Sequence, residues 1–178
     1  WIKFYGLLTG HLEEAENFFD TKVDELLSVL TGEDYGRTVA FFYINSAGAA
    51  VVRKTTDYIP KMIEMAGGRY IFSTLDQEDN ALSTTNMQME AFYNGAIDAD
   101  IIIYNSTIDG EIFTIGELLD KSRLLADFKA VKEGNVWCSE SNMFQQTSGF
   151  ADMIKDMHEV ISGRAGSGEG LAFLHKVN

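Results

Sequence analysis

Apolar residues along the chain follow a helical pattern first and a strand pattern afterwards. From Trp1 to Leu30 they fall mostly at steps of three and four, which predicts helix with one buried face, interrupted at Thr9-Gly10. A turn-rich run at 31–36 ends this pattern, and the continuous apolar run at 38–44 predicts a strand that is buried on both faces. We therefore expect a helical segment followed by a sheet.

Strand-like and helix-like runs alternate through the rest of the chain. Further strands are predicted at 49–53, 69–72, 98–105 and 135–138, and helices from Asp57, near 86–94, from Thr114 and at 150–161. Strands that alternate with helices imply right-handed crossovers and parallel pairing. The predicted fold class is α/β, a three-layer sandwich with a central, mainly parallel sheet of four to five strands, as in a Rossmann-like lobe.

Helix ends and the tail carry local signals. Thr85 with Gln88, and Thr114 with Glu117, have the spacing of capping boxes, and Gly163 is expected to stop the last helix. The tail at 162–178 contains a glycine–serine patch and a short apolar end. The glycines of this patch follow a helix instead of a strand, and the segment has no lysine at the position that a phosphate-binding loop requires. We therefore expect a flexible tail and no nucleotide site.

Charge and composition exclude several kinds of function. The 178 residues include 27 acidic and 14 basic side chains, a formal charge of −13, which makes nucleic acid an unfavourable partner. Cys138 is the single cysteine, and the histidines at 11, 158 and 175 are far apart in the predicted order, so we expect no disulfide and no metal site. No apolar stretch has the length of a membrane span. The chain opens on Trp1, and we expect further sequence upstream.

Candidate binding residues follow from the predicted topology. In an open parallel sheet, ligands bind beyond the carboxyl ends of the strands. The candidate residues at or just beyond the ends of the predicted strands are mostly polar or aromatic: Tyr43, Asn45, Asn105, Ser106, Asn142, Met143, Phe144 and Gln145. Such uncharged groups suit a bulky organic or chelated ligand better than a bare cation. Polar loop tips are equally typical of α/β domains without a ligand, so this alternative stays open.

Two further observations concern charge and catalysis near these strands. Arg53 and Lys54 form a rare basic pair that would suit an anionic ligand group, although a solvated pair is an equal alternative. Asp98 and Asp100 precede a strand and would lie at its amino end. No nucleophile motif is present and Cys138 has no histidine partner in sequence, so no catalytic residue is predicted.

Four segments in order resemble a known family: WIKFYGLLTGHLEEAENFF at 1–19, DYIPKMIEMAGGRYIF at 57–72, NMQMEAFYNGAIDADIIIYN at 86–105 and DFKAVKEGNVWC at 127–138. The chain resembles the C-terminal lobe of the class III, helical-backbone substrate-binding proteins. These proteins deliver ferric siderophores, haem or cobalamin to ABC importers. The likeness covers about residues 1–162.

The resemblance implies an organisation and a function. Residues 1–30 would be the end of the inter-lobe helix and the helix after it, and 31–178 the ligand-binding lobe, with the N-terminal lobe outside this chain. The protein would bind a metal chelate between two lobes, without catalysing a reaction and without a catalytic cofactor. It would lie outside the cytoplasmic membrane, as a periplasmic or lipid-anchored protein. Glu90 would pair with an arginine of the ABC permease. The open cleft face predicts self-association of the isolated lobe.

Two alternatives remain open at this stage. An enzyme on a flavodoxin-like or dehydrogenase-like sheet would bind a nucleotide or flavin, yet only one glycine follows the first strand, in AFFYINSAG. A binder of free zinc or manganese would need several histidines or carboxylates at strand ends, where Glu140 alone qualifies.

Overall fold

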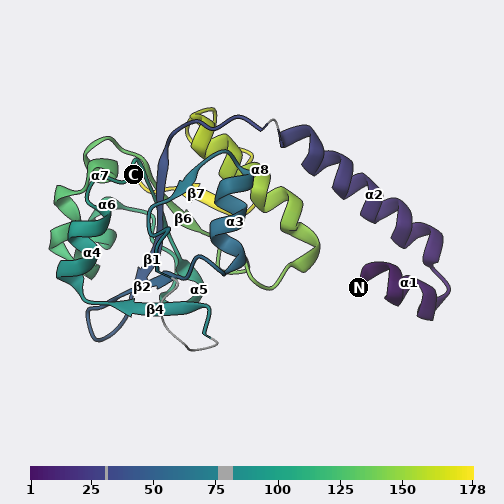
Figure 1. Cartoon of the computed structure of the whole chain (residues 1–178), viewed down its shortest axis with the longest axis horizontal. Coiled ribbons are helices and arrows are strands. Elements are labelled where there is room, and N and C mark those ends of the chain that lie inside the picture. The colour runs from purple at the N-terminus through teal and green to yellow at the C-terminus, as the bar shows by residue number, and fades with distance from the viewer. Residues whose placement is uncertain (31, 76–81) are drawn as a thin grey trace.

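The computed structural model of the chain describes residues 1–30, 32–75 and 82–178. Two antiparallel helices, α1 (Ile2–Thr9) and α2 (Leu12–Val29), form an arm that projects from the remaining residues, here called the lobe (Figure 1). Gly10 ends α1 in the left-handed conformation, with φ 78°, which confirms the predicted interruption. The predicted buried face is confirmed only in part: Ala15 is buried and Leu26 packs against the core, but Phe4, Leu8 and Phe19 are exposed.

A seven-stranded sheet forms the centre of the lobe. Its strands are β1 (Thr38–Ile44), β2 (Ala50–Arg53), β3 (Arg69–Tyr70), β4 (Thr84–Met87), β5 (Ile101–Tyr104), β6 (Val136–Ser139) and β7 (Leu174–Lys176). The order is β4-β2-β1-β5-β6-β7, with β3 paired to the start of β1. The pairs β1–β5, β5–β6 and β1–β3 are parallel, whereas β2, β4 and β7 pair antiparallel with their neighbours. The parallel centre is confirmed, and the sheet is larger than predicted.

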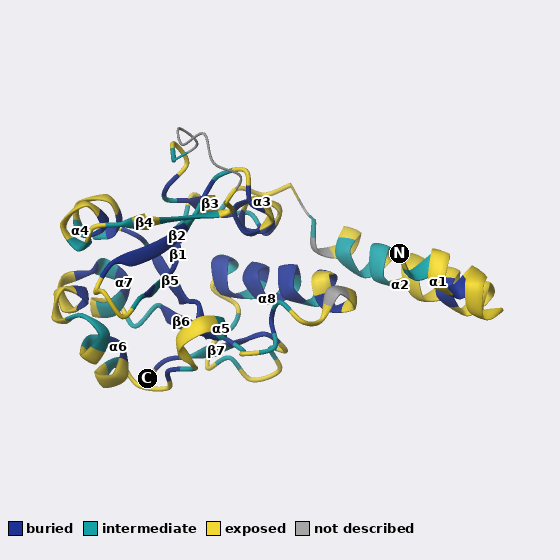
Figure 2. Ribbon diagram, turned by 90° about the horizontal axis from the view of Figure 1, so that it is seen from below, coloured by how far each residue is buried: buried dark blue, intermediate teal, exposed yellow. Residues whose placement is uncertain are grey.

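Helices cover both faces of this sheet, which confirms the α/β three-layer architecture. On one side lie α3 (Tyr58–Met65) and α8 (Phe150–Ser162), and on the other lie α4 (Met89–Ala96), α6 (Ile115–Lys121) and α7 (Lys129–Lys132) (Figures 1 and 2). A short helix, α5 (Ser106–Asp109), follows β5, and 3-10 turns lie at Arg123–Asp127 and Thr147–Gly149. Asp57 caps α3, and Thr114 with Glu117 forms the predicted capping box of α6.

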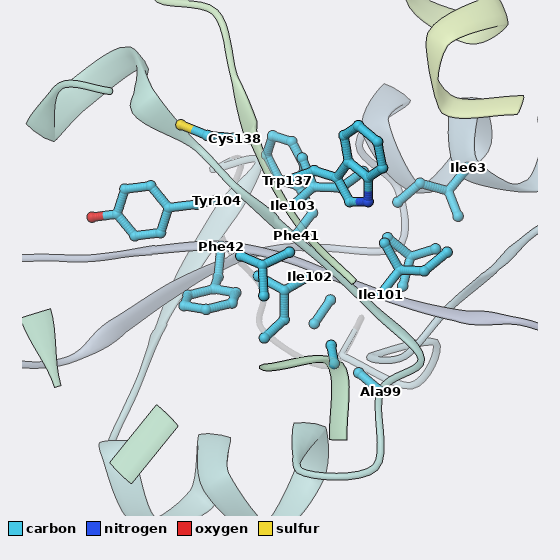
Figure 3. Packing of buried hydrophobic residues seen from close by; sticks show 14 of the residues in the cluster. Phe41, Phe42, Ile63, Ala99, Ile101, Ile102, Ile103, Tyr104, Trp137 and Cys138 are labelled. Atoms are coloured by element: carbon cyan, nitrogen blue, oxygen red, sulfur yellow. The ribbon is translucent and has the colours of Figure 1, made fainter. Parts of the chain in front are cut away.

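The core explains why the parallel strands are apolar throughout. Side chains alternate between the two covered faces, so Phe41 and Phe42 on β1 are both buried, as are all residues of β5 (Figure 3). Phe42 packs against Phe92 of α4, with 4.5 Å between ring centroids. Each fully buried large side chain of this kind contributes roughly 1.5–3 kcal/mol.

Two predicted elements need correction. Residues 84–87 form an edge strand, not the start of a helix, and α4 begins at Met89 without a side-chain cap from Gln88. The Thr85–Gln88 capping box is therefore wrong, because pairing of β4 with β2 satisfies the backbone there. The predicted strand at 69–72 is limited to Arg69–Tyr70.

The C-terminal tail is also corrected. We expected a flexible segment, but Leu174–Lys176 forms β7 and pairs antiparallel with β6. Phe173, Leu174 and Val177 are buried in the main core. Gly163 ends α8 in the left-handed conformation as predicted, with φ 81°. The short apolar end is thus a strand, whose long-range partner was not recognised.

Candidate functional site

The carboxyl ends of β1, β5 and β6 lie at one edge of the sheet, here called the carboxyl edge. The β1–β2 turn, the start of α5 and the loop after β6 all begin there. The helices α3 and α8 also begin near this edge, because each leads to a strand or segment at the other end of the sheet. The topology therefore brings together the segments that carry the predicted ligand-binding residues.

Asn45 shapes the first of these segments. Its side-chain oxygen accepts hydrogen bonds from the backbone N–H groups of Ala47 and Ala49, each at 3.0 Å. Its amide nitrogen lies 3.5 Å from the side-chain oxygen of Asn86 on β4. Tyr43 is half-buried and shares a sheet face with Asn86, because both pair with Val51. The Asn45 side chain thus stabilises the β1–β2 turn, and the Tyr43 side chain is partly exposed to solvent.

Asn105 and Ser106 are buried, each 2% exposed. The Asn105 side-chain oxygen caps α5 by accepting hydrogen bonds from the Thr107 N–H at 3.3 Å and the Thr107 hydroxyl at 2.7 Å. The Ser106 N–H donates to the Ser139 hydroxyl oxygen at 3.1 Å. Through these hydrogen bonds the two residues connect the end of β5 to the end of β6 and stabilise the backbone at the carboxyl edge.

Arg53 ends β2 and is held at its backbone by Tyr70. The Arg53 N–H donates to the Tyr70 hydroxyl at 3.0 Å, and that hydroxyl donates to the Arg53 carbonyl at 2.8 Å. Burial raises the pKa of Tyr70 well above its ordinary value, so its proton stays available for this bond. The neighbouring Lys54 is only 3% exposed. Two hydrogen bonds to Tyr70 therefore hold the backbone of Arg53 in place.

The guanidinium of Arg53 lies among aromatic rings and one carboxylate. Its central carbon is 4.8 Å from the ring centroid of Phe144 and 5.9 Å from that of Phe41. One of its nitrogens is 3.5 Å from the carboxylate of Asp57. The Arg53 and Asp57 side chains are 13% and 4% exposed. The pair is thus mostly shielded from water, which strengthens it.

Two more aromatic rings extend this group, which we name the aromatic–arginine cluster: Arg53, Asp57, Tyr58, Phe144 and Phe150. The Tyr58 ring centroid lies 6.1 Å from that of Phe144 and 5.4 Å from that of Phe150. Tyr58 is 38% exposed and Phe150 is 40% exposed, so the cluster reaches the surface. Burial raises the pKa of Tyr58, so its hydroxyl keeps its proton at neutral pH.

The sequence reasoning missed Tyr58, Phe150 and the role of Asp57. In the sequence predictions Phe150 is only the first residue of the helix at 150–161, and Asp57 is only the start of a helix. The available signal was the i, i+4 spacing of Arg53 and Asp57 together with an aromatic residue directly after the cap. These residues precede or begin helices, whereas the predicted ligand-binding residues lie at the ends of strands.

The loop after β6 is fastened at its base and partly open at its tip. Glu140 lies 2.9 Å from Nδ1 of His175, and the Ser141 N–H donates to the Glu111 carboxylate at 2.8 Å. Met143 is buried, Phe144 half-buried and Gln145 exposed. The side-chain oxygen of Asn142 is buried and has no hydrogen-bond partner among the described residues. An acceptor of this kind is available to a ligand or a water molecule.

Glu90 lies apart from the cluster. It is exposed in the first turn of α4, in the helical layer opposite α3 and α8. Its carboxylate is favoured there by the helix dipole. A surface at Glu90 and the aromatic–arginine cluster are therefore separated by the sheet.

The Cys138 thiol and possible metal ligands are the other groups that bear on chemistry in this chain. Burial raises the pKa of the Cys138 thiol to about 12, so the thiol keeps its proton and is not a nucleophile at neutral pH. Within residues 1–30, 32–75 and 82–178, no three His, Cys, Asp or Glu side chains are grouped as metal ligands. In the same ranges, no helix is long and apolar enough to cross a membrane.

Comparison with known sequences gives one distant relative. The chain is 27% identical over 182 residues to an uncharacterised lipoprotein of Methanocaldococcus jannaschii, matching all of this chain and 42% of that protein. No family model matches the sequence. The chain therefore spans less than half the length of this curated relative.

Comparison with solved structures gives closer matches in fold. The TroA-like periplasmic binding protein FepB from Veillonella parvula matches 99% of this chain and 60% of its own, with a TM-score of 0.72 and 13% identity. An ABC-type Fe3+-hydroxamate transport protein from Saccharomonospora viridis gives a TM-score of 0.68 and 16% identity, and the match covers 89% of this chain and 53% of that protein. Streptococcus pneumoniae PiaA, solved with ferrichrome, gives a TM-score of 0.59 and 18% identity, and the match covers 93% of this chain and 57% of PiaA.

These likenesses confirm the expected fold. The chain has the fold of part of these periplasmic binding proteins, and it spans a little over half of the length of each of them. At this level of identity the comparison concerns architecture, and ligand and partners are separate questions.

Proposed function

We propose that this chain is the C-terminal lobe of an extracytoplasmic substrate-binding protein, which holds a metal chelate between two lobes and presents it to an ABC permease. The observation that carries the proposal is the aromatic–arginine cluster beside the carboxyl edge of a lobe with this fold. Aromatic rings and a guanidinium match the flat, partly apolar surface of an organic chelate.

The proposed contacts come from residues that reach the surface. Tyr43, Asn45, Arg53, Asn142, Phe144 and Gln145 would face the ligand, joined by Tyr58 and Phe150. Lys54, Asn105, Ser106 and Met143 are buried and would support the site from beneath. The neighbours with ferrichrome or Fe3+-hydroxamate in their descriptions make a ferric siderophore the first ligand to test, followed by haem and cobalamin.

The proposed mechanism is binding and handover without bond making. The cluster is built on strands and helix starts whose backbones are hydrogen-bonded, as at Arg53, Asn105 and the Glu140 loop. A preorganised surface of this kind costs little ordering entropy when the ligand binds. The proposed location is outside the cytoplasmic membrane, which the lipoprotein relative and the periplasmic neighbours support.

A titration tests the ligand proposal. The full-length protein is titrated with ferrichrome, haem and cobalamin while tryptophan fluorescence is recorded. Trp137 lies in the core strand β6 and gives a signal from within the lobe. We expect saturable quenching with a Kd of about 1 μM or below for one chelate. Failure of all three to bind, or chemical turnover of a bound chelate, would disprove the proposal.

An uptake assay tests docking at Glu90 separately. Glu90→Ala is expected to reduce chelate uptake by cells while leaving the Kd unchanged, because a rim charge fixes docking more than ligand binding. Glu169→Ala is the matched control, since Glu169 is also exposed but lies in the segment between α8 and β7. Normal uptake by the Glu90 variant would remove the docking role.

A further inference from the structure

The aromatic–arginine cluster contains one cation and one anion that neutralise each other. Arg53 and Asp57 are four residues apart, and their charged groups lie 3.5 Å from each other. Both side chains are largely buried, so little solvent screens the interaction. The arginine at the proposed site is therefore already paired before any ligand arrives.

The geometry around the guanidinium limits what it can offer to a ligand. Phe144 and Phe41 lie near the guanidinium carbon, and Asp57 occupies one nitrogen. The Asp57 carboxylate lies 3.5 Å from the guanidinium, so it would repel an anionic ligand that the guanidinium attracts, and the two effects would largely cancel. The aromatic–arginine cluster therefore presents to a ligand an aromatic, hydrogen-bonding surface without net charge.

The other charges of the chain also bear on an anionic ligand. Lys54 is buried, and the loop after β6 begins at Glu140, which pairs with His175, and at Ser141, whose N–H donates to the Glu111 carboxylate. The chain as a whole has a formal charge of −13. The surroundings thus disfavour an anion further.

We infer that Asp57 sets the charge preference of this site: by pairing with Arg53 it makes the lobe favour electrically neutral chelates over anionic ones. The inference rests on the proposed function. Hydroxamate groups that surround a ferric ion cancel its charge, whereas catecholate groups leave the chelate strongly anionic. The ligand class assigned to this lobe is therefore a neutral metal chelate, for which a ferric trihydroxamate is the neutral probe and a ferric tris-catecholate the anionic one.

Asp57 has a second role that the test must preserve. One oxygen of its carboxylate accepts the Ile59 N–H at 2.9 Å and caps α3. Asparagine caps helices as well as aspartate does, so Asp57→Asn removes the charge and keeps an acceptor for the cap. Asp57→Ser, another good cap, is the second variant in case the first does not fold.

The experiment compares two chelates on the full-length protein. Ferrichrome is the neutral probe and a ferric tris-catecholate is the anionic probe, each titrated by fluorescence quenching at low and high salt. We expect the unaltered protein to prefer ferrichrome, and Asp57→Asn to shift the ratio of the two affinities roughly tenfold towards the catecholate, an effect that shrinks in high salt. Asp34→Asn is the matched control, because Asp34 pairs with Arg69 at an exposed position.

The outcomes separate this inference from the proposed function. If the unaltered protein binds the catecholate as tightly as ferrichrome, or if neither Asp57 variant shifts the ratio, the inference is overturned and the proposed function stands. An equal shift in the Asp34 variant also overturns it. If no chelate binds any of the proteins, the proposed function fails and the inference fails with it.

Discussion

The guanidinium carbon of Arg53 lies 4.8 Å from the ring centroid of Phe144. Arg53 ends β2 and Phe144 belongs to the loop after β6, so this contact joins segments that flank the parallel centre of the sheet. A cation over an aromatic ring contributes about 0.5–2 kcal/mol, more when water is excluded. The contact therefore holds the loop after β6 against the α3 and α8 face of the sheet.

Replacing Phe144 by alanine should weaken both this loop and ligand binding. The ring is half-buried and touches Arg53 and Tyr58, so we expect the free energy of unfolding to fall by about 1–2 kcal/mol. Chelate affinity of the full-length protein should fall roughly tenfold, because the ring is also proposed to contact the ligand. Urea unfolding and fluorescence titration measure the two effects. Ile108→Ala, at an exposed position on α5, should change neither. An unchanged affinity would exclude Phe144 from the site.

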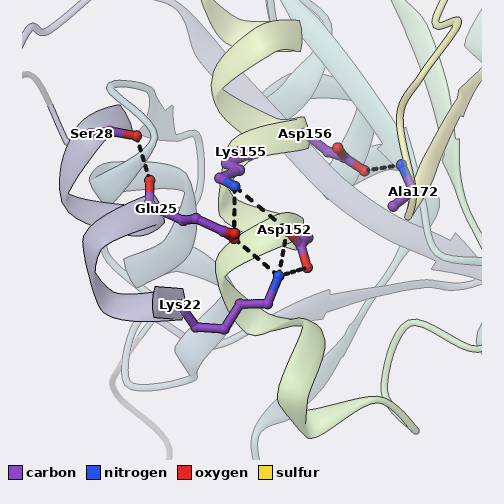
Figure 4. A network of polar contacts seen from close by, with 7 residues as sticks. All are labelled: Lys22, Glu25, Ser28, Asp152, Lys155, Asp156 and Ala172. Atoms are coloured by element: carbon purple, nitrogen blue, oxygen red, sulfur yellow. Dashed lines mark hydrogen bonds and ion pairs between the residues drawn. The ribbon is translucent and has the colours of Figure 1, made fainter. Parts of the chain in front are cut away.

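Asp156 makes stability depend on pH with an unusual sign. Burial raises its pKa to about 6, outweighing the backbone N–H groups that donate to its carboxylate, from Ala172 (Figure 4) and from Phe173. In the unfolded chain the same group titrates near 3.8. Between about pH 4 and 6 the folded protein thus binds more protons than the unfolded chain. The free energy of unfolding should fall as the pH rises through this window, by at most about 3 kcal/mol.

Asp156→Asn isolates this contribution. The amide keeps an acceptor for residues 172 and 173 but does not titrate. Asp100 and Asp109 have lowered pKa values and give slopes of the opposite sign at more acidic pH, and these are common to both proteins and cancel. Urea unfolding from pH 4 to 7 should show the stability difference between the natural protein and the variant shrinking or reversing with rising pH. Two parallel curves would contradict the assignment.

How much of the fold could be predicted depended on whether the signal was local. The strand at 38–44 was predicted because both of its faces are buried, which leaves a continuous apolar run. The capping box at Thr114 was predicted because both partners lie within one helical turn. The strands β4 and β7 were not predicted, because one is short and polar at the sheet edge and the other depends on pairing with distant β6.

The candidate site was predictable to a similar extent. The rule that ligands lie beyond strand ends leads to Phe144 and Asn142, and the scarcity of basic residues leads to Arg53. Neither reveals that Asp57 neutralises Arg53, because pairing depends on side-chain directions in space. Nor does it reveal that Asn105 and Ser106 are buried, since their hydrogen bonds to Thr107 and Ser139 form only in the folded sheet.

Four charged side chains attach the arm to the lobe. Nζ of Lys22 lies 2.9 Å from the Asp152 carboxylate on α8, and Glu25 accepts hydrogen bonds from both Lys22 and Lys155 at 3.0 Å (Figure 4). The Lys22 and Asp152 side chains are partly exposed, so screening limits the strength of their pair. A double-mutant cycle with Lys22→Ala and Asp152→Ala should give a coupling energy of about 0.5 kcal/mol that declines in high salt.

The chain offers a matched control for this cycle. Lys3 and Asp20 are 3.1 Å apart but more exposed, and both belong to the arm. Their coupling should be smaller than that of Lys22 and Asp152, and changes in it should not affect how the arm sits on α8. Equal coupling in the two cycles would show that the network adds nothing beyond an ordinary surface ion pair.

The arm predicts how the isolated chain behaves in solution. Large apolar side chains at Trp1, Phe4 and Leu8 are exposed, and a groove of about 760 Å³ lies between the arm and the start of α8. Exposed apolar patches of this kind drive association, so residues 1–178 alone should self-associate as their concentration rises. Sedimentation velocity measures this directly. Phe4→Glu with Leu8→Glu should shift the protein to monomer, whereas Ile108→Glu, at an equally exposed position on α5, should not. A monomer at high concentration would mean that the arm's apolar face is tolerated in water, and association through it would be excluded.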